Sequence, residues 1–265
     1  MKIGIVGCAG RMGRMLTAAT LDTPGAELAG GTEAPGSPYL GADLGVVAGG
    51  QPSGLTVGDD PAALFEAADT VIDFTRPAAT LAHAALAAKH GKALVVGTTG
   101  LADADMKKLD EAAAGAVIVQ AGNMSLGVNL LLGLVKQAAQ ALGPDYDIEV
   151  VEMHHRHKVD APSGTALMLG RAAAEGRGIH HAEAAVMSRE GHTGERPQGA
   201  IGYATLRGGD VIGDHSLIFA GPGERVELSH KSTGRDLFAR GALKAALWTE
   251  GRAPGLYTMR DVLGF

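Results

Sequence analysis

The sequence concentrates its chemically active side chains in one short stretch, residues 152–165. Between residues 154 and 160, six side chains can carry charge or move a proton: His154, His155, Arg156, His157, Lys158 and Asp160. Ser163 and Gly164 follow and open an apolar run at 166–169, which is a helix-start signal. Because the N–H groups of a first helical turn attract anions, the stretch combines proton donors with a carboxylate site. This combination suits a small anionic substrate.

Two other interpretations of the three histidines compete with this one. A metal site is disfavoured because no second Cys or His pair lies nearby at ligand spacing, and the cation would lie beside Arg156 and Lys158. A solvated surface turn explains any one of these residues more easily than all of them beside a helix start. We therefore expect a catalytic stretch without a metal.

Composition restricts the class of protein. The 265 residues, 46% hydrophobic and 20% charged, are enough for one large or two modest folded domains. The net charge of -6 argues against a general nucleic-acid binder, which needs a basic face. No run of about 18 apolar residues occurs, so no membrane span is expected. The first residues indicate a strand and not a signal peptide, and Cys8 has no partner for an internal disulfide. These features predict a cytoplasmic enzyme.

The N-terminus carries a variant of the dinucleotide fingerprint. An apolar strand at 2–6 leads into Gly7-Cys8-Ala9-Gly10-Arg11-Met12-Gly13, and an amphipathic helical run follows. The glycines permit a tight turn in which backbone N–H groups approach a pyrophosphate. A second strand at 27–32 ends at Glu33, which is well placed to bind an adenosine ribose. The alternative, a loop carboxylate, does not explain the agreement of turn, helix and strand.

The choice between NADH and NADPH can be addressed from the same region. A 2′-phosphate requires a Lys or Arg close to the acidic residue, but Ala34 and Pro35 follow Glu33. No Lys or Arg occurs from Met15 to Thr75, so Arg11 is the only evident cation within reach. We expect NADH to serve at least as well as NADPH.

Strand and helix patterns alternate from residue 2 to residue 124, which predicts an α/β fold with a doubly wound parallel sheet. After residue 125 a long apolar helix at 128–142 is followed by a strand at 148–152, a helix at 164–175 and several strand-like runs. These predict an α+β domain with an open mixed sheet, whose exposed face another subunit would cover. A last helix at 237–249 returns to the first domain. The expected domains are 1–124, completed by 236–265 and binding a dinucleotide, and 125–235, binding substrate and partner subunits.

With both stretches in view, the chain resembles the 4-hydroxy-tetrahydrodipicolinate reductase (dihydrodipicolinate reductase) family of bacterial lysine and diaminopimelate synthesis over nearly its full length. Besides the glycine turn and residues 152–166, the resemblance rests on residues 73–77, 97–100 and 188–196. It implies an oxidoreductase that transfers hydride from NAD(P)H to the dehydrated form of 4-hydroxy-tetrahydrodipicolinate, giving tetrahydrodipicolinate. It also implies a homotetramer assembled through the second domain.

The resemblance assigns roles to particular residues. His154 is implied as proton donor or acceptor, Lys158 as the second proton donor, and His155, Gly164 and Thr165 as contacts of a cyclic dicarboxylate substrate. Ala34 departs from the family, many of whose NADPH-accepting members carry arginine there. The implied cofactor-binding residues are Gly7, Cys8, Ala9, Gly10, Arg11, Met12, Glu33, Gly97, Thr98, Thr99, Ala121, Gly122, Asn123 and Met124.

Two other functions remain as alternatives. A nucleotide-sensing binding module would bind cofactor without turnover, and it gives no reason for the proton-donor stretch. The second alternative is another two-domain reductase, of the homoserine dehydrogenase or the aspartate-semialdehyde dehydrogenase type. The aspartate-semialdehyde dehydrogenase type needs a catalytic cysteine, whereas Cys8 belongs to the nucleotide turn.

Overall fold

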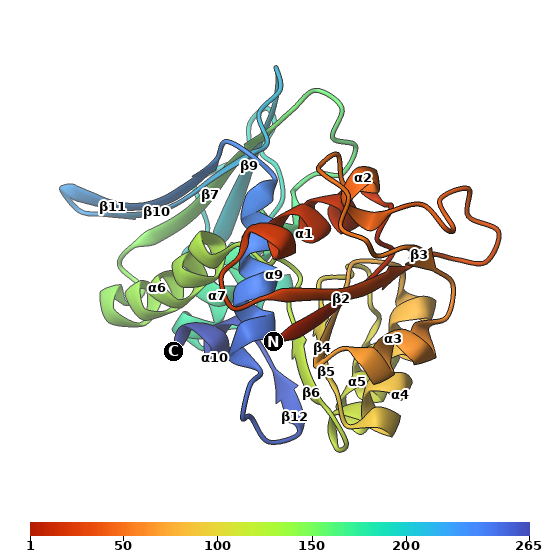
Figure 1. The fold of residues 1–265 in the computed structure, drawn as a ribbon. Helices are drawn as coiled ribbons and strands as arrows, with labels where there is room; N and C mark the ends of the chain where they lie inside the picture. Colours follow the sequence, from red (N-terminus) through yellow and green to blue (C-terminus); the bar gives the residue numbers. More distant parts are fainter. The chain divides into compact units, whose positions relative to one another are not determined.

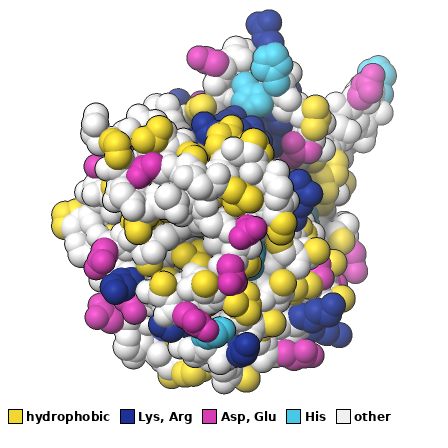
Figure 2. All heavy atoms as spheres, turned by 45° about the vertical axis from the view of Figure 1, so that its right-hand side comes forward, with side chains coloured by type: hydrophobic (Ala, Val, Ile, Leu, Met, Phe, Trp, Pro, Cys, Tyr) yellow, Lys and Arg dark blue, Asp and Glu magenta, His cyan; other side chains and the backbone are white.

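The computed structural model describes all 265 residues, and the chain divides into two compact units (Figure 1). Unit 1 contains Met1–Ser125 and Asp236–Gly264, whereas unit 2 contains Leu126–Arg235 and Phe265. No helix combines the length and apolar character that a membrane span requires. Acidic and basic side chains are interspersed on the face shown in Figure 2, where histidines lie beside lysine and arginine in the upper part.

Unit 1 is built on a seven-stranded sheet in which every strand pair is parallel, in the order β12-β6-β5-β4-β1-β2-β3. The central strands are buried along nearly their whole length, as strands covered on both faces must be. This confirms the predicted doubly wound parallel sheet. The strands are β1 (Lys2–Val6), β2 (Glu27–Thr32), β3 (Val57–Gly58), β4 (Thr70–Asp73), β5 (Ala93–Val96), β6 (Val117–Gln120) and β12 (Gly255–Tyr257).

Helices cover both faces of this sheet. α1 and α9 pack together on one face, and α3, α4 and α5 lie on the other (Figure 1). α9 returns to unit 1, as the sequence predicts. The helices are α1 (Arg11–Asp22), α2 (Leu44–Val47), α3 (Pro61–Ala67), α4 (Pro77–His90), α5 (Asp103–Ala113), α9 (Asp236–Trp248) and α10 (Met259–Leu263).

Two elements near the C-terminus are absent from the sequence prediction. β12 is a half-buried edge strand of three residues, which is too short for a pattern to be recognised. α10 has a detectable start signal, because the hydroxyl of Thr258 accepts a hydrogen bond from the N–H of Arg260 while Asp261 bonds back to Thr258. Residues 35–60 carry little regular structure, as expected, apart from α2 and β3.

Unit 2 contains a five-stranded sheet in the order β11-β10-β7-β9-β8. β10 is antiparallel to β7 and β11, whereas β9 is parallel to β7 and β8, so the predicted mixed sheet is confirmed. The elements are α6 (Leu126–Leu142), β7 (Asp147–His154), α7 (Gly164–Arg177), α8 (His181–Ala184), β8 (Ala185–Val186), β9 (Ile201–Arg207), β10 (Gly213–Gly221) and β11 (Glu224–Ser232).

The two faces of this sheet differ in burial. Along β7 the side chains of Ile148, Val150, Glu152 and His154 are buried, and the alternating side chains are half-buried. α6 and α7 pack together over the buried face, whose core includes Leu131, Leu169 and Phe219 among others. The buried face of β7 is thus apolar at its beginning and polar at its end.

Candidate active site

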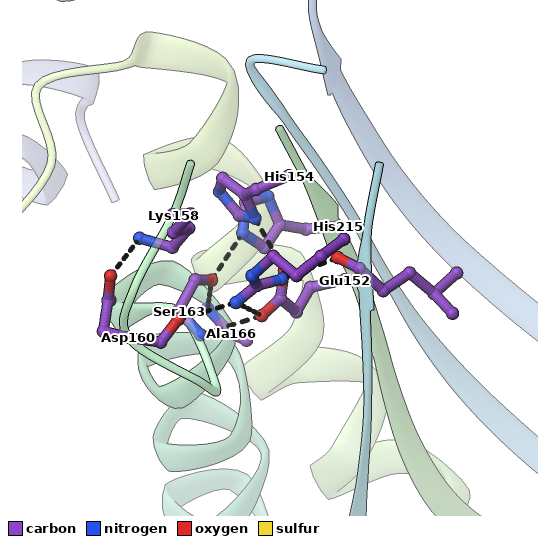
Figure 3. Close-up of polar contacts among 9 residues, drawn as sticks. Glu152, His154, Lys158, Asp160, Ser163, Ala166 and His215 are labelled. Carbon is purple, nitrogen blue, oxygen red and sulfur yellow. Dashed lines mark hydrogen bonds and ion pairs between the residues drawn. The ribbon is translucent and has the colours of Figure 1, made fainter. Parts of the chain in front are cut away.

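The register of the mixed sheet gathers four polar residues at the end of β7. His154 on β7 pairs with Arg207 on β9, and Glu152 pairs with His215 on β10. All four side chains lie on the face of the sheet that packs against α7. Residues two positions away on the same strands, such as Val150 and Leu217, are also buried on this face. Figure 3 shows Glu152, His154 and His215 together with Ser163 at the start of α7.

Glu152 is the centre of this group and is only 1% exposed. One carboxylate oxygen, Oε2, accepts from His154 Nδ1 at 2.6 Å and from the Arg207 guanidinium at 2.8 Å. The other, Oε1, accepts from the Ser163 N–H at 3.0 Å and from the second Arg207 nitrogen at 2.9 Å. Burial raises the pKa of Glu152, but the hydrogen bonds from Arg207 and His154 outweigh it and hold the pKa below its usual range. Glu152 is therefore an ionised carboxylate.

The orientation of His154 follows from this contact. An ionised carboxylate accepts hydrogen bonds only, so Nδ1 of His154 carries a proton and Nε2 is the position that titrates. The side chain is 8% exposed, and burial lowers its pKa, against the opposing effect of Glu152. Gly213 makes room for the ring, because a Cβ there would lie 3.0 Å from Nε2 of His154. At neutral pH the ring is mostly uncharged and can accept a proton on Nε2.

Ser163 connects this group to α7. Its hydroxyl oxygen accepts from the Ala166 N–H at 3.1 Å, which caps the helix, and lies 2.8 Å from Nε2 of His215. His215 is 4% exposed, and its ring centroid is 5.0 Å from that of His154. Burial lowers the pKa of His215 to about 4, so its imidazole is uncharged at neutral pH.

Lys158 lies on the loop between β7 and α7. Its ammonium group bonds to the carboxylate of Asp160 at 2.8 Å, and the backbone carbonyl of Asp160 accepts from Arg207 at 2.7 Å. Val159, between them, is 99% exposed. The loop therefore holds a cationic proton donor close to the Glu152 group and leaves its tip in solvent.

The predicted substrate contacts lie on either side of this loop. Gly164 and Thr165 form the first turn of α7, whose N–H groups point out along the helix axis. Nδ1 of His155 is buried without a protein partner, and its backbone N–H donates to the carbonyl of Val211. No three His, Cys, Asp or Glu side chains are arranged to hold a metal ion. Unit 2 thus brings His154, Lys158, His155 and the start of α7 into one region.

Unit 1 carries a groove of about 830 Å³ at the carboxyl ends of β1 and β2. Gly7 adopts φ 67°, which favours glycine, and a Cβ on Gly13 would lie 2.1 Å from the carbonyl oxygen of Gly7. The N–H of Ala9 donates to the Glu33 carboxylate at 2.7 Å. The groove is lined by Val6, Gly7, Ala9, Gly10, Thr32, Glu33, Ala34, Pro35, Ser37, Tyr39, Asp59, Pro61, Phe74, Thr75, Arg76, Ala79 and His83.

A second pocket of about 310 Å³ lies along the ends of the next strands. Phe74 and Thr75 line both cavities. Together, the glycine turn, the Glu33 carboxylate and the adjoining pocket fit an adenine dinucleotide. That pocket is lined by Met12, Phe74, Thr75, Gly97, Thr98, Thr99, Gly122, Asn123, Met124 and Phe238.

Three of the predicted cofactor residues line neither cavity. Cys8 is buried, its N–H donates to the carbonyl of Thr32, and burial raises the pKa of its thiol to about 12. Ala121 is also buried, and Arg11 is exposed at the first position of α1. The roles of these three, like those of the other cofactor residues, remain predictions.

The prediction that Arg11 is the only cation within reach of the ribose site is wrong. Arg76 lines the same groove as Glu33, because the end of β4 lies beside that of β1. The guanidinium of Arg14 lies 5.0 Å from the ring centroid of Tyr39, another lining residue. Arg76 was not predicted because it is far from Glu33 in the sequence. Arg14 was not predicted because it lies one residue before the stretch without Lys or Arg.

Several residues of these sites carry no role in the sequence prediction. Glu152 is detectable in principle, since alternation along β7 places it on the same face as His154. In unit 1, buried Asp73 accepts from the N–H and hydroxyl of Thr75, from the hydroxyl of Thr98 and from Nδ1 of His83. Asp73 therefore holds three side chains that line the cofactor cavities.

A parallel sheet with a glycine turn and a dinucleotide groove, in a chain that also carries a carboxylate-supported histidine, defines a nicotinamide-dependent oxidoreductase. The match to the N-terminal model of dihydrodipicolinate reductase covers residues 1–124, and the match to the C-terminal model covers residues 127–263. The chain belongs to the dihydrodipicolinate reductase family.

Relatives and a solved structure agree with this assignment. The 4-hydroxy-tetrahydrodipicolinate reductase of Dinoroseobacter shibae is 56% identical over 99% of this chain and 97% of its own length. That of Brucella abortus is 57% identical over 100% and 99%. The dipicolinate-bound dihydrodipicolinate reductase from Paenisporosarcina sp. TG-14 has the same fold, with a TM-score of 0.77, 24% identity and 98% of each chain covered. The predicted family, enzyme class and function in lysine and diaminopimelate synthesis are confirmed.

Proposed function

We propose that this chain reduces the dehydrated form of 4-hydroxy-tetrahydrodipicolinate to tetrahydrodipicolinate, with His154 and Lys158 handling protons. The observation that carries the proposal is the arrangement in unit 2. There a buried carboxylate orients His154 and accepts from the Ser163 N–H at the start of α7, and Arg207 connects that carboxylate to the Lys158 loop. A cyclic dicarboxylate needs anion binding and proton delivery in one place, and this group supplies both.

Substrate binding is assigned to the beginning of α7. The N–H groups of Gly164 and Thr165 and the positive end of the helix dipole hold a carboxylate without adding a titrating group. The buried Nδ1 of His155 supplies a further polar contact from the loop. We assign substrate binding to unit 2 and dinucleotide binding to unit 1.

Loss of the substrate's hydroxyl as water gives a conjugated imine. When bound, the nicotinamide cofactor supplies the hydride that adds at the far end of this conjugation. Electron density then moves toward the ring nitrogen, and a proton must reach carbon. The ammonium group of Lys158, which bonds to Asp160, can give a proton, whereas His154 can accept and return one on Nε2.

The cofactor is NAD(P)H, and NADH is proposed to serve at least as well as NADPH. Ala34 supports this, because no cation directly follows Glu33. Arg76, in the same groove, is the residue best placed to bind a 2′-phosphate. Steady-state kinetics with both cofactors test the proposal, and a hundredfold preference for NADPH would contradict it.

The enzyme is proposed to act in the cytoplasm as a homotetramer. The support for assembly is the face of the unit 2 sheet opposite α6 and α7, where half-buried Val151, Met153 and Ile218 alternate with the buried positions. Light scattering of the purified protein would measure the assembled mass. A monomer at micromolar concentration would reject the tetramer.

The decisive experiment follows NADH absorbance with the cyclic product of pyruvate and aspartate semialdehyde. The wild type is expected to oxidise NADH, and His154→Ala and Lys158→Ala to lose most of the turnover. Near-normal turnover in Lys158→Ala would remove that residue from the mechanism. Cofactor binding without turnover in the wild type would instead favour a binding module.

A further inference from the structure

Three segments of unit 2 meet at the Glu152 carboxylate: β7, the start of α7 and β9. Glu152 lies on β7 and bonds to His154 on the same strand, to Ser163 at the start of α7 and to Arg207 on β9. Each oxygen accepts two hydrogen bonds, so the carboxylate is fixed in direction as well as in place. These four contacts offset the cost of burying the charge of Glu152 at 1% exposure.

Arg207 extends the same group to the catalytic loop. One of its nitrogens donates both to Glu152 Oε1, at 2.9 Å, and to the backbone carbonyl of Asp160, at 2.7 Å. Asp160 in turn holds the ammonium of Lys158. Both proposed proton-handling side chains and the carboxylate-binding turn therefore depend on a single ion pair.

We propose that Glu152 and Arg207 are positioning residues that fix the tautomer of His154 and hold the Lys158 loop against the start of α7. The inference rests on the proposed function and deepens it. Glu152 keeps the proton of the neutral His154 imidazole on Nδ1, which leaves the lone pair of Nε2 available to accept a proton. Without the carboxylate, the neutral ring can carry its proton on Nε2 instead and then cannot accept one there.

β7 supplies a matched control on its other face. Glu149 accepts from two nitrogens of Arg189, both at 2.8 Å, and from Arg196 at 2.9 Å. This is a second carboxylate held by arginine on the same strand, but it contacts neither a histidine nor α7. A general structural role would make the two ion pairs equivalent, whereas a positioning role makes only the Glu152 pair matter for turnover.

The test compares Arg207→Gln with Arg189→Gln in the full-length enzyme, with Arg207→Lys as the conservative variant. Arg207→Gln is expected to lower kcat by about 10- to 100-fold, as loss of an orienting partner does elsewhere, and Arg189→Gln by less than about 2-fold. Arg207→Lys keeps the charge and is expected to recover part of the loss. Equal kcat values for Arg207→Gln and Arg189→Gln would overturn the inference.

Two further readouts concern Glu152 itself. Glu152→Gln removes the effect that raises the pKa of His154, so the limb of the kcat/KM profile that reports His154 is expected to move to lower pH. The charged or titratable groups facing His154 are Glu152 on β7, Arg207 on β9, His215 on β10 and Lys158 on the loop. The ¹⁵N spectrum of His154 is expected to show the Nδ1–H tautomer in the wild type and a mixture in Glu152→Gln.

The ¹⁵N measurement needs no substrate, so it separates the two proposals. A wild type that fails to turn over the substrate, but whose His154 tautomer depends on Glu152, would reject the proposed function and keep the positioning role. Normal turnover with an unchanged tautomer in Glu152→Gln would reject the positioning role alone. If Glu152→Gln does not fold, the Arg207 variants decide, since the Arg207 side chain is 21% exposed and tolerates replacement better.

Discussion

Ser163→Ala offers a quantitative test of how α7 is joined to the sheet. The hydroxyl of Ser163 caps α7 through the Ala166 N–H and is the partner of Nε2 of His215. Removing it breaks both interactions with a single-atom deletion, and the position is almost fully buried, so water cannot easily replace the hydroxyl.

The magnitude follows from the two contacts. Loss of a serine N-cap costs about 1 kcal/mol. Leaving the buried His215 nitrogen without a partner adds roughly 1–3 kcal/mol. We therefore expect Ser163→Ala to lower the free energy of unfolding of unit 2 by about 2–4 kcal/mol.

Amide hydrogen exchange within α7 measures the loss of unfolding free energy in unit 2 alone. The measurement does not require the two units to unfold in a single transition. Thr258→Ala is the control, because Thr258 caps α10 through the Arg260 N–H but has no buried partner beyond the helix. Its expected cost is about 1 kcal/mol, measured in α10. The reasoning would be refuted if Ser163→Ala cost no more than Thr258→Ala.

Four further outcomes are expected. Lys158→Ala should lower kcat by roughly 10²- to 10⁴-fold with little change in KM, and an effect confined to KM would make Lys158 a binding residue only. His215 has a folded pKa of about 4 against 6.5 when unfolded, so the unfolded state binds more protons and stability falls from pH 6.5 to pH 4, by about 3 kcal/mol. Denaturant titrations should show His215→Gln without this loss. Arg76→Gln should raise KM for NADPH about 10-fold and leave that for NADH nearly unchanged; equal effects would exclude phosphate recognition. Gly213→Ala should lower kcat about 10-fold in a folded protein by displacing His154, and unchanged kcat would show that the ring has spare room.

Much of the fold of unit 1 follows from the sequence, because its central strands β1, β4 and β5 are short, mostly apolar runs bounded by turn residues. The N-terminal turn is an example, since Gly7 and Gly13 have no tolerable substitute at their positions in the structure. β12 escapes prediction because three half-buried residues at a sheet edge carry no periodicity. The C-terminal α10 has a capping signal at Thr258 that is readable from the sequence once it is sought.

The candidate active site is predictable only where its residues are close in the sequence. His154, Lys158 and Gly164 stand within one stretch, and local patterns connect them. Arg207 reaches the site through the pairing of β7 with β9, and no local pattern specifies which strands of a mixed sheet are neighbours. Arg76 lines the same groove as Glu33 for the same reason, since the order of strands in space differs from their order along the chain.

The polarity gradient along the buried face of β7 has an evolutionary consequence. Ile148 and Val150 belong to the buried core of unit 2, whereas two residues further on the same row of side chains carries Glu152 and His154 of the proposed proton-handling group. Mutational tolerance should therefore be lowest along this strand and should rise sharply at Val159, which contacts almost nothing. Within the 155–161 loop, Val159 is therefore the position where diversity endangers folding least, whereas His155, Lys158 and Asp160 should be kept for function.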